Sequence, residues 1–141
     1  MSKINLGRVI LGGLAAGIVL AILESIVEGV FLAGQWGVAM KALGKPEAMS
    51  VKQIVAYNVL SLGIGIVAVW LYAAMRPRFG PGPKTALLAG FTLWLAAYAI
   101  PSAPLAFQHI FPLGLELIDI AIGLAVVLIA TVAGACVYKE A

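Results

Sequence analysis

Acidic side chains inside apolar stretches are the residues of this sequence that could carry chemistry. Glu24 and Glu28 fall within the first long apolar stretch, and Glu116 and Asp119 open the last one. Carboxylates are costly in hydrocarbon, and acids in membrane segments commonly mark ion or proton sites. The spacings Glu-x-x-x-Glu and Glu-x-x-Asp place each pair on one face of a helix, as two ligands of one site must be.

A cation site is one interpretation of these acids. Carboxylate oxygens together with a histidine nitrogen suit calcium, manganese, iron or zinc, so a divalent metal ion is a candidate cofactor. The Glu-x-x-His motif of carboxylate-bridged di-metal bundles does not occur in the sequence. The predicted metal ligands are Glu24, Glu28, His109, Glu116 and Asp119.

Polar and aromatic residues on the two middle stretches are predicted to complete a ligand-binding site. The opposite part of every stretch consists almost entirely of aliphatic residues, alanine and glycine. Because no polar path continues through that part, a pocket open to one side fits better than a channel. The predicted binding residues are Glu24, Glu28, Tyr57, Asn58, Ser61, Trp94, Tyr98, Glu116 and Asp119.

Two alternatives to a binding pocket remain open. The acids could hydrogen-bond to neighbouring helices as structural glue, in a structural or accessory subunit of a membrane complex, where such bonds contribute about 0.6 kcal/mol on average. They could also belong to a proton or ion transporter, which a chain of 141 residues would form only as an oligomer. Enzyme signatures such as Gly-x-Ser-x-Gly, a phosphate-binding glycine loop or His-Glu-x-x-His are absent, which disfavours an enzyme.

Composition defines the elements that must position these residues. Hydrophobic residues make up 63% of the chain and charged residues 11%, and the mean hydropathy is +1.10, all far from soluble averages. About 20 helical residues cross a hydrocarbon core of about 30 Å. We therefore predict a single all-α membrane domain over residues 1–141, an antiparallel four-helix transmembrane bundle with short loops, whose spans are residues 9–33, 54–75, 85–107 and 113–138.

Depth and helical faces both predict that the acids meet. At about 1.5 Å per residue, Glu24 lies about 8 Å short of the far boundary of the first span, and Asp119 lies about 9 Å inside the same boundary. Glu24 continues a stripe of small residues that includes Gly13 and Gly17, and Gly123 follows Asp119 by one turn. Small residues four apart let membrane helices approach closely, so both acids are expected on packing seams.

The loops predict orientation and surface contacts. Most basic residues fall on the side of the chain ends, which the positive-inside rule makes cytoplasmic. Residues 76–84 are rich in proline and glycine, and we expect an irregular basic loop whose Arg76, Arg78 and Lys84 contact anionic lipid headgroups. Residues 34–52 are expected to hold a short interfacial helix with Trp36 at headgroup level, and Ser50 is a candidate cap for the second span. Nothing resembles a nucleic-acid-binding surface.

A short segment carries a family resemblance. The residues Phe31-Leu32-Ala33-Gly34-Gln35-Trp36, followed by Met40-Lys41-Ala42-Leu43-Gly44, resemble a segment of small four-span bacterial membrane proteins of uncharacterised function. The resemblance implies a bacterial inner-membrane protein with four spans. It implies no activity, and it covers none of the four intramembrane acids.

Overall fold

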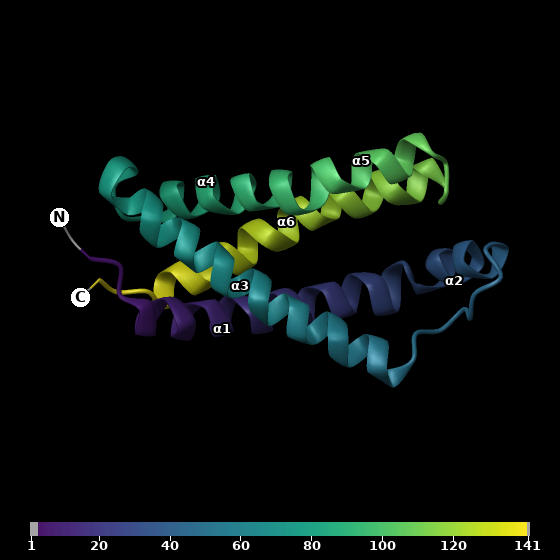
Figure 1. Ribbon diagram of the computed structural model, residues 1–141, viewed down its shortest axis with the longest axis horizontal. Helices are drawn as coiled ribbons and strands as arrows, with labels where there is room; N and C mark the ends of the chain where they lie inside the picture. Colours follow the sequence, from purple (N-terminus) through teal and green to yellow (C-terminus); the bar gives the residue numbers. More distant parts are fainter. Residues whose placement is uncertain (1–2, 141) are drawn as a thin grey trace.

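The structure is a computed structural model that describes residues 3–140, and every regular element in that range is helical (Figure 1). This confirms the all-α prediction. Two of the spans contain a π-helical segment, η1 or η2, which interrupts the α-helical hydrogen bonding. The elements are α1 (Leu6–Ile26), η1 (Val27–Phe31), α2 (Ala33–Ala42), α3 (Val51–Phe79), α4 (Pro83–Trp94), η2 (Leu95–Ala99), α5 (Ile100–Phe107) and α6 (Leu113–Val137).

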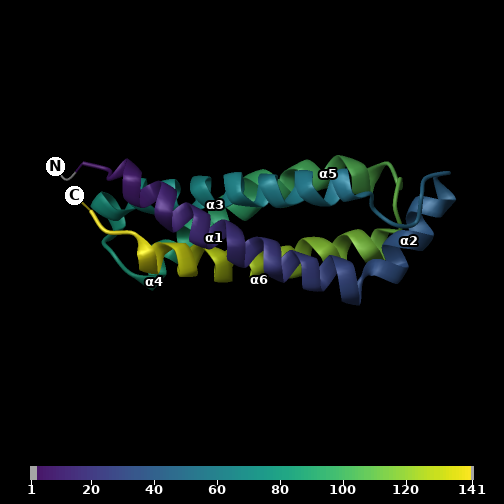
Figure 2. The ribbon, with the colours of Figure 1, turned by 90° about the horizontal axis from the view of Figure 1, so that it is seen from below.

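Four helical rods are long and apolar enough to cross a membrane, which makes the chain an integral membrane protein. The first combines α1 with η1, and the third joins α4, η2 and α5 into one continuous rod. Both described chain ends lie at one end of the bundle, here called the termini end, and α2 lies at the other, the α2 end (Figures 1 and 2). The four rods are Leu6–Phe31, Val51–Phe79, Pro83–Phe107 and Leu113–Val137.

Glycine sets the crossing of α1 and α3. A methyl group added at Gly17 would lie 2.6 Å from the Cα of Leu62, and one added at Gly65 would meet the backbone of Gly13 and Gly17. Only residues without a side chain permit such backbone contact, which is the usual basis of close helix packing in membranes. Because the helices cross at an angle, they separate on both sides of this contact.

A second close contact joins α1 to α6. A methyl group at Gly134 would lie 2.7 Å from the Cβ of Ala16 and 2.7 Å from the carbonyl oxygen of Gly12. Farther along, α6 packs against α4, where Gly90 faces Thr131. Helix α1 therefore contacts both α3 and α6 through small residues, as the glycine stripe predicted.

The basic loop is shorter than predicted, because α3 continues through Pro77 to Phe79. Pro77 lacks the backbone N–H that would bond the carbonyl of Ala73, and α3 ends two residues after it. The chain then reverses over residues 80–82, where Gly80 and Gly82 adopt positive φ angles of 83° and 126°. The prediction of an irregular segment over residues 76–84 is wrong for residues 76–79, which belong to α3, and for residues 83–84, which begin α4.

Side chains from distant segments join at the termini end. The hydroxyl of Tyr138 accepts a hydrogen bond from the backbone N–H of Asn5 at 3.3 Å, and that of Tyr72 accepts one from Gly82 at 3.1 Å. The guanidinium of Arg76 lies 5.7 Å and 5.3 Å from the ring centres of Tyr72 and Tyr138, and it pairs with Glu140 at 3.8 Å. Both chain ends and the α3–α4 turn are thereby tied together.

The segment predicted to hold a short helix contains α2, and Ser50 caps α3 in a capping box with Gln53. Helix α2 follows η1 after a single residue, Leu32. In the third span, helical structure continues past Pro101 and Pro104 to Phe107. The π turn of η2 directly precedes these prolines, and such local adjustments let membrane helices accommodate them.

Candidate functional site

Three carboxyl groups converge where α1 and η1 face α6. The side chain of Asp119 on α6 is a neighbour of both Glu24 and Glu28. The hydroxyl of Tyr98 donates a hydrogen bond of 2.9 Å to Oε1 of Glu24. All four residues are partly buried. We call them the carboxyl cluster.

Both π-helical segments lie at the carboxyl cluster. Glu28 belongs to η1 and Tyr98 belongs to η2, while Glu24 precedes η1 by three residues. Single π turns inside helices are rare and are frequent at functional sites. Here they set the directions of two of the cluster's four side chains, an effect that a regular 3.6-residue period does not anticipate.

Helix α2 adjoins the cluster on the side facing the α2 end. Its Trp36 ring meets the Phe111 ring edge-on at a centroid distance of 5.3 Å, and Leu32 and Ala39 pack with Leu115. The indole Nε1 of Trp36 is buried beside Glu28 but, within the described residues, makes no hydrogen bond of ordinary geometry. Trp36 therefore adds an unpaired donor to a site otherwise rich in acceptors.

The predicted metal-ligand set is not assembled. Among residues 3–140, no three His, Cys, Asp or Glu side chains are arranged to hold a metal ion. His109 is exposed in the α5–α6 loop, and Glu116 lies one turn nearer the α2 end than Asp119. Glu116 is only 5% exposed, and its Oε2 has no hydrogen-bond partner in the described part of the chain. The four acids thus divide into a converging trio and one separate buried carboxyl.

Residues of α3 do not join the carboxyl cluster. Asn58 donates a 2.8 Å hydrogen bond to the carbonyl of Ile54 on its own helix, and Tyr57 is 58% exposed. The Ser61 hydroxyl likewise donates to the carbonyl of Tyr57, at 3.0 Å. Beyond the glycine crossing α3 diverges from the bundle, and every residue from 51 to 60 is exposed (Figure 1). The divergence of α3 keeps Tyr57 and Asn58 away from the cluster, whereas Ser61 is buried at the glycine crossing beside Gly17.

Trp94 supports the cluster without belonging to it. Its indole Nε1 donates a 2.9 Å hydrogen bond to the backbone carbonyl of Ile120 on α6. A methyl group added at Gly123 would lie 3.7 Å from Cδ1 of Tyr98 and 4.0 Å from this nitrogen, which is ordinary contact. The hydrogen bond of Trp94 therefore joins α4 to α6 beside Tyr98.

No basic side chain neutralises the cluster within residues 3–140. The ion pairs there join Lys41 to Glu47 at 3.2 Å in the α2–α3 region and Arg76 to Glu140 at the termini end. Two hollows in the surface, of about 260 and 510 Å³, are both lined by α1 and α3 and contain none of the cluster's residues. The carboxyl groups thus lie together with a hydroxyl and an indole N–H as their neutral polar neighbours.

Sequence reasoning placed Trp36 in a loop helix but not at the site, and it missed Phe111. The signal was an aromatic residue on each of two segments that enter the bundle at the same end. Comparison with models of protein families, with curated proteins and with solved structures gives no match to this chain.

Proposed function

We propose that this chain is a membrane protein whose carboxyl cluster binds a small cation, with the proton as the smallest occupant. One observation carries the proposal: Glu24, Glu28 and Asp119 converge inside a helical bundle without a basic partner in the described residues. Carboxylates grouped in a medium of low dielectric repel one another and favour a positive charge among them. A proton or another small cation meets that requirement.

The neighbours of the cluster limit the occupant's size and charge. The hollows of about 260 and 510 Å³ are lined by α1 and α3 and contain no residue of the cluster, so neither provides space for an organic ligand at the acids. The absence of a three-ligand arrangement in residues 3–140 argues against a tightly held divalent metal. The geometry is best suited to a proton or a singly charged cation bound between Glu28 and Asp119.

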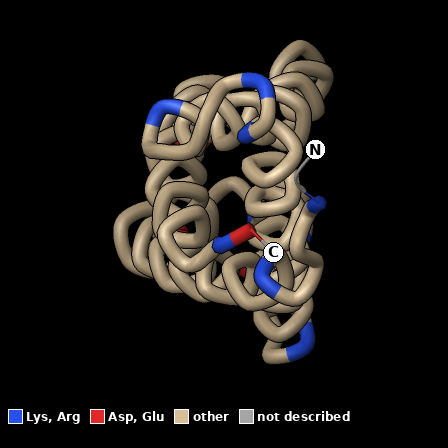
Figure 3. The backbone as a smooth tube through the Cα atoms, turned by 90° about the vertical axis from the view of Figure 1, so that its left-hand side faces the viewer, with Lys and Arg blue, Asp and Glu red and all other residues tan. Residues whose placement is uncertain are grey.

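We place the chain in the bacterial inner membrane, and the charge distribution supports an orientation with both termini in the cytoplasm. Basic residues ring the termini end, which faces the viewer in Figure 3. The basic residues at the α2 end are Lys41, Lys45 and Lys52, and the first of these is paired with Glu47. By the positive-inside rule the carboxyl cluster then lies in the half of the bundle that faces the periplasm.

Reaction with a hydrophobic carbodiimide tests cation binding, because this reagent modifies protonated carboxyl groups within membranes. We expect modification of Glu28 or Asp119, found by mass spectrometry of peptides. Addition of sodium, potassium or ammonium, each at constant ionic strength, should slow the modification if that cation occupies the site. Slowing by raised pH alone would identify the proton as the occupant.

Glu47 provides the internal control for this experiment. Its side chain is 61% exposed and paired with Lys41, so its reactivity should not follow the cation present. A cluster that fails to react, or that reacts at one rate under all cation and pH conditions, contradicts the proposal.

The second candidate function is structural, in a membrane subunit whose acids join helices. The 2.9 Å hydrogen bond from Tyr98 to Glu24 favours it, because this bond directly connects η2 with α1. In that case the cluster's carboxyls would serve a homo-oligomer or a complex with another membrane protein only by fixing helix positions. Replacing the cluster's acids by Gln or Asn would then change stability, and neither the wild type nor the variants would respond to cations.

Cysteine labelling tests the orientation. After replacement of the exposed Cys136 by serine, a single cysteine is placed at Lys45 or at Gly82. A reagent that cannot cross membranes should label the first in intact cells and the second only after the membrane is opened. The opposite pattern would place the carboxyl cluster on the cytoplasmic side.

A further inference from the structure

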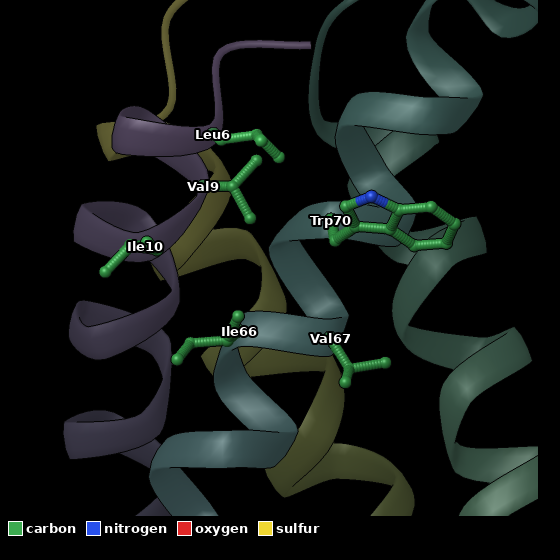
Figure 4. A pocket seen from close by; sticks show the side chains of 6 residues that line it. All are labelled: Leu6, Val9, Ile10, Ile66, Val67 and Trp70. Carbon is green, nitrogen blue, oxygen red and sulfur yellow. The ribbon is translucent and has the colours of Figure 1, made fainter.

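The first hollow lies between α1 and α3, on the side of the glycine crossing that faces the termini end. Its volume is about 260 Å³, and its wall is apolar throughout. Figure 4 shows the side chains of Leu6 and Val9 directed from α1 toward the space between the helices, and Ile66 directed from α3 toward α1. The lining residues are Leu6, Val9, Ile10, Ile66, Val67 and Trp70.

Helix crossing explains why this hollow exists. The backbones of α1 and α3 touch at Gly13, Gly17 and Gly65, so the two axes separate toward the termini end. Val9 is 2% exposed at the base of the hollow, whereas Val67 and Trp70 at its rim are each 46% exposed. The result is a groove open to the membrane rather than an enclosed cavity.

Trp70 and Arg78 give the hollow a polarity along the membrane normal. The indole nitrogen of Trp70 lies on the side of the ring nearer the termini end (Figure 4), as expected for a tryptophan approaching an interface. Arg78 follows Val67 by eleven residues, which is three helical turns, and it therefore shares that face of α3 about 16 Å farther along. The apolar groove and Arg78 therefore lie one after the other along the same face of α3.

Arg78 is also the α3 arginine whose charge remains free. Arg76 is covered by Tyr72 and Tyr138 and paired with Glu140, whereas Arg78 is exposed and makes no ion pair with the described residues. Together with the exposed Lys84, it leaves positive charge uncompensated at the membrane surface. A negatively charged group on the occupant would complement it.

We infer that this groove is a binding site for an anionic phospholipid, with one acyl chain between α1 and α3 and the headgroup at Arg78. The apolar wall fits a hydrocarbon chain, and the free guanidinium fits a phosphate-bearing headgroup. This sharpens the general expectation of headgroup contacts at residues 76, 78 and 84 by separating Arg78 from Arg76. It is independent of the carboxyl cluster, which faces another side of α1.

Quenching of Trp70 fluorescence tests the site. Wild-type protein and Trp70→Phe are reconstituted with phospholipids brominated on the acyl chains, and the difference between them reports on Trp70. At a low fraction of brominated lipid, brominated phosphatidylglycerol should quench Trp70 more strongly than brominated phosphatidylcholine. Arg78→Gln should lower this preference about fivefold, because one basic residue near the surface contributes about 1 kcal/mol.

Lys52→Gln is the matched control, because it removes the same charge from an exposed residue at the other end of the bundle. This variant should keep the preference for phosphatidylglycerol. Equal quenching by the two lipids in the wild type would overturn the inference, and so would a preference that persists in Arg78→Gln.

Discussion

The two ends of this bundle use polar residues in opposite ways. At the termini end, Arg76 is placed between two tyrosine rings and a carboxylate, so that charge and hydrogen bonds are balanced among side chains. At the α2 end, Glu24, Glu28 and Asp119 have a hydroxyl and an indole N–H nearby but no basic partner in the described residues. Side chains whose charges are balanced stabilise the fold, whereas grouped carboxyls without a basic partner require a further positive charge among them.

The glycine crossing separates the two ends and holds both in place. Gly65→Leu would drive a side chain into the backbone of Gly13 and Gly17. We expect the largest effect of any single change here, a loss of about 1–3 kcal/mol or more, because overpacking at a backbone contact has no flexible neighbour to relieve it. Thermal unfolding in detergent measures this loss.

Gly63→Leu is the control for that change, because a side chain at Gly63 would meet nothing within 4 Å. If both leucine variants unfold at the same temperature, the crossing is not where the bundle depends on close approach.

Removing Arg76 from the network at the termini end should lower the stability of the protein by a smaller amount. Arg76→Gln removes a cation that lies against Tyr72 and Tyr138, and we expect a loss of about 1–2 kcal/mol, since such contacts are strongest when partly desolvated. Arg78→Gln removes an exposed arginine of the same helix and should change stability by less than about 0.5 kcal/mol. Equal losses would mean that the network does not stabilise this end.

Breaking the hydrogen bond at the unbalanced end should have the smallest effect on stability. Tyr98→Phe removes the bond to Glu24, and intramembrane hydrogen bonds contribute about 0.6 kcal/mol on average and about 1.7 kcal/mol at most. Tyr57→Phe, on the exposed part of α3, should be neutral. A loss well above that range in Tyr98→Phe would favour the structural interpretation of the cluster.

Sequence arguments predicted the spans and the meeting of the acids for simple reasons. Apolar length identifies a membrane helix, and the constant rise of an α-helix places Glu24 and Asp119 at one depth. The same arguments failed for Tyr57 and Asn58, because depth does not report the divergence of α3 beyond its crossing. The position of Trp36 beside Glu28 depends on a π turn and on the following break at Leu32, which the hydrophobic pattern does not encode.

Comparison of the wild type with a neutralised cluster tests the central claim most directly. The melting temperature of the protein in detergent is measured as sodium, potassium or ammonium replaces choline at constant ionic strength, and again as pH is lowered. A bound cation stabilises the folded state by mass action, by about 2.7 kcal/mol at a hundred times its dissociation constant. The wild type should therefore melt at a higher temperature as the occupant's concentration rises, while Glu28→Gln/Asp119→Asn should not respond. The same response in both proteins, or none in either, would contradict a cation site at the carboxyl cluster.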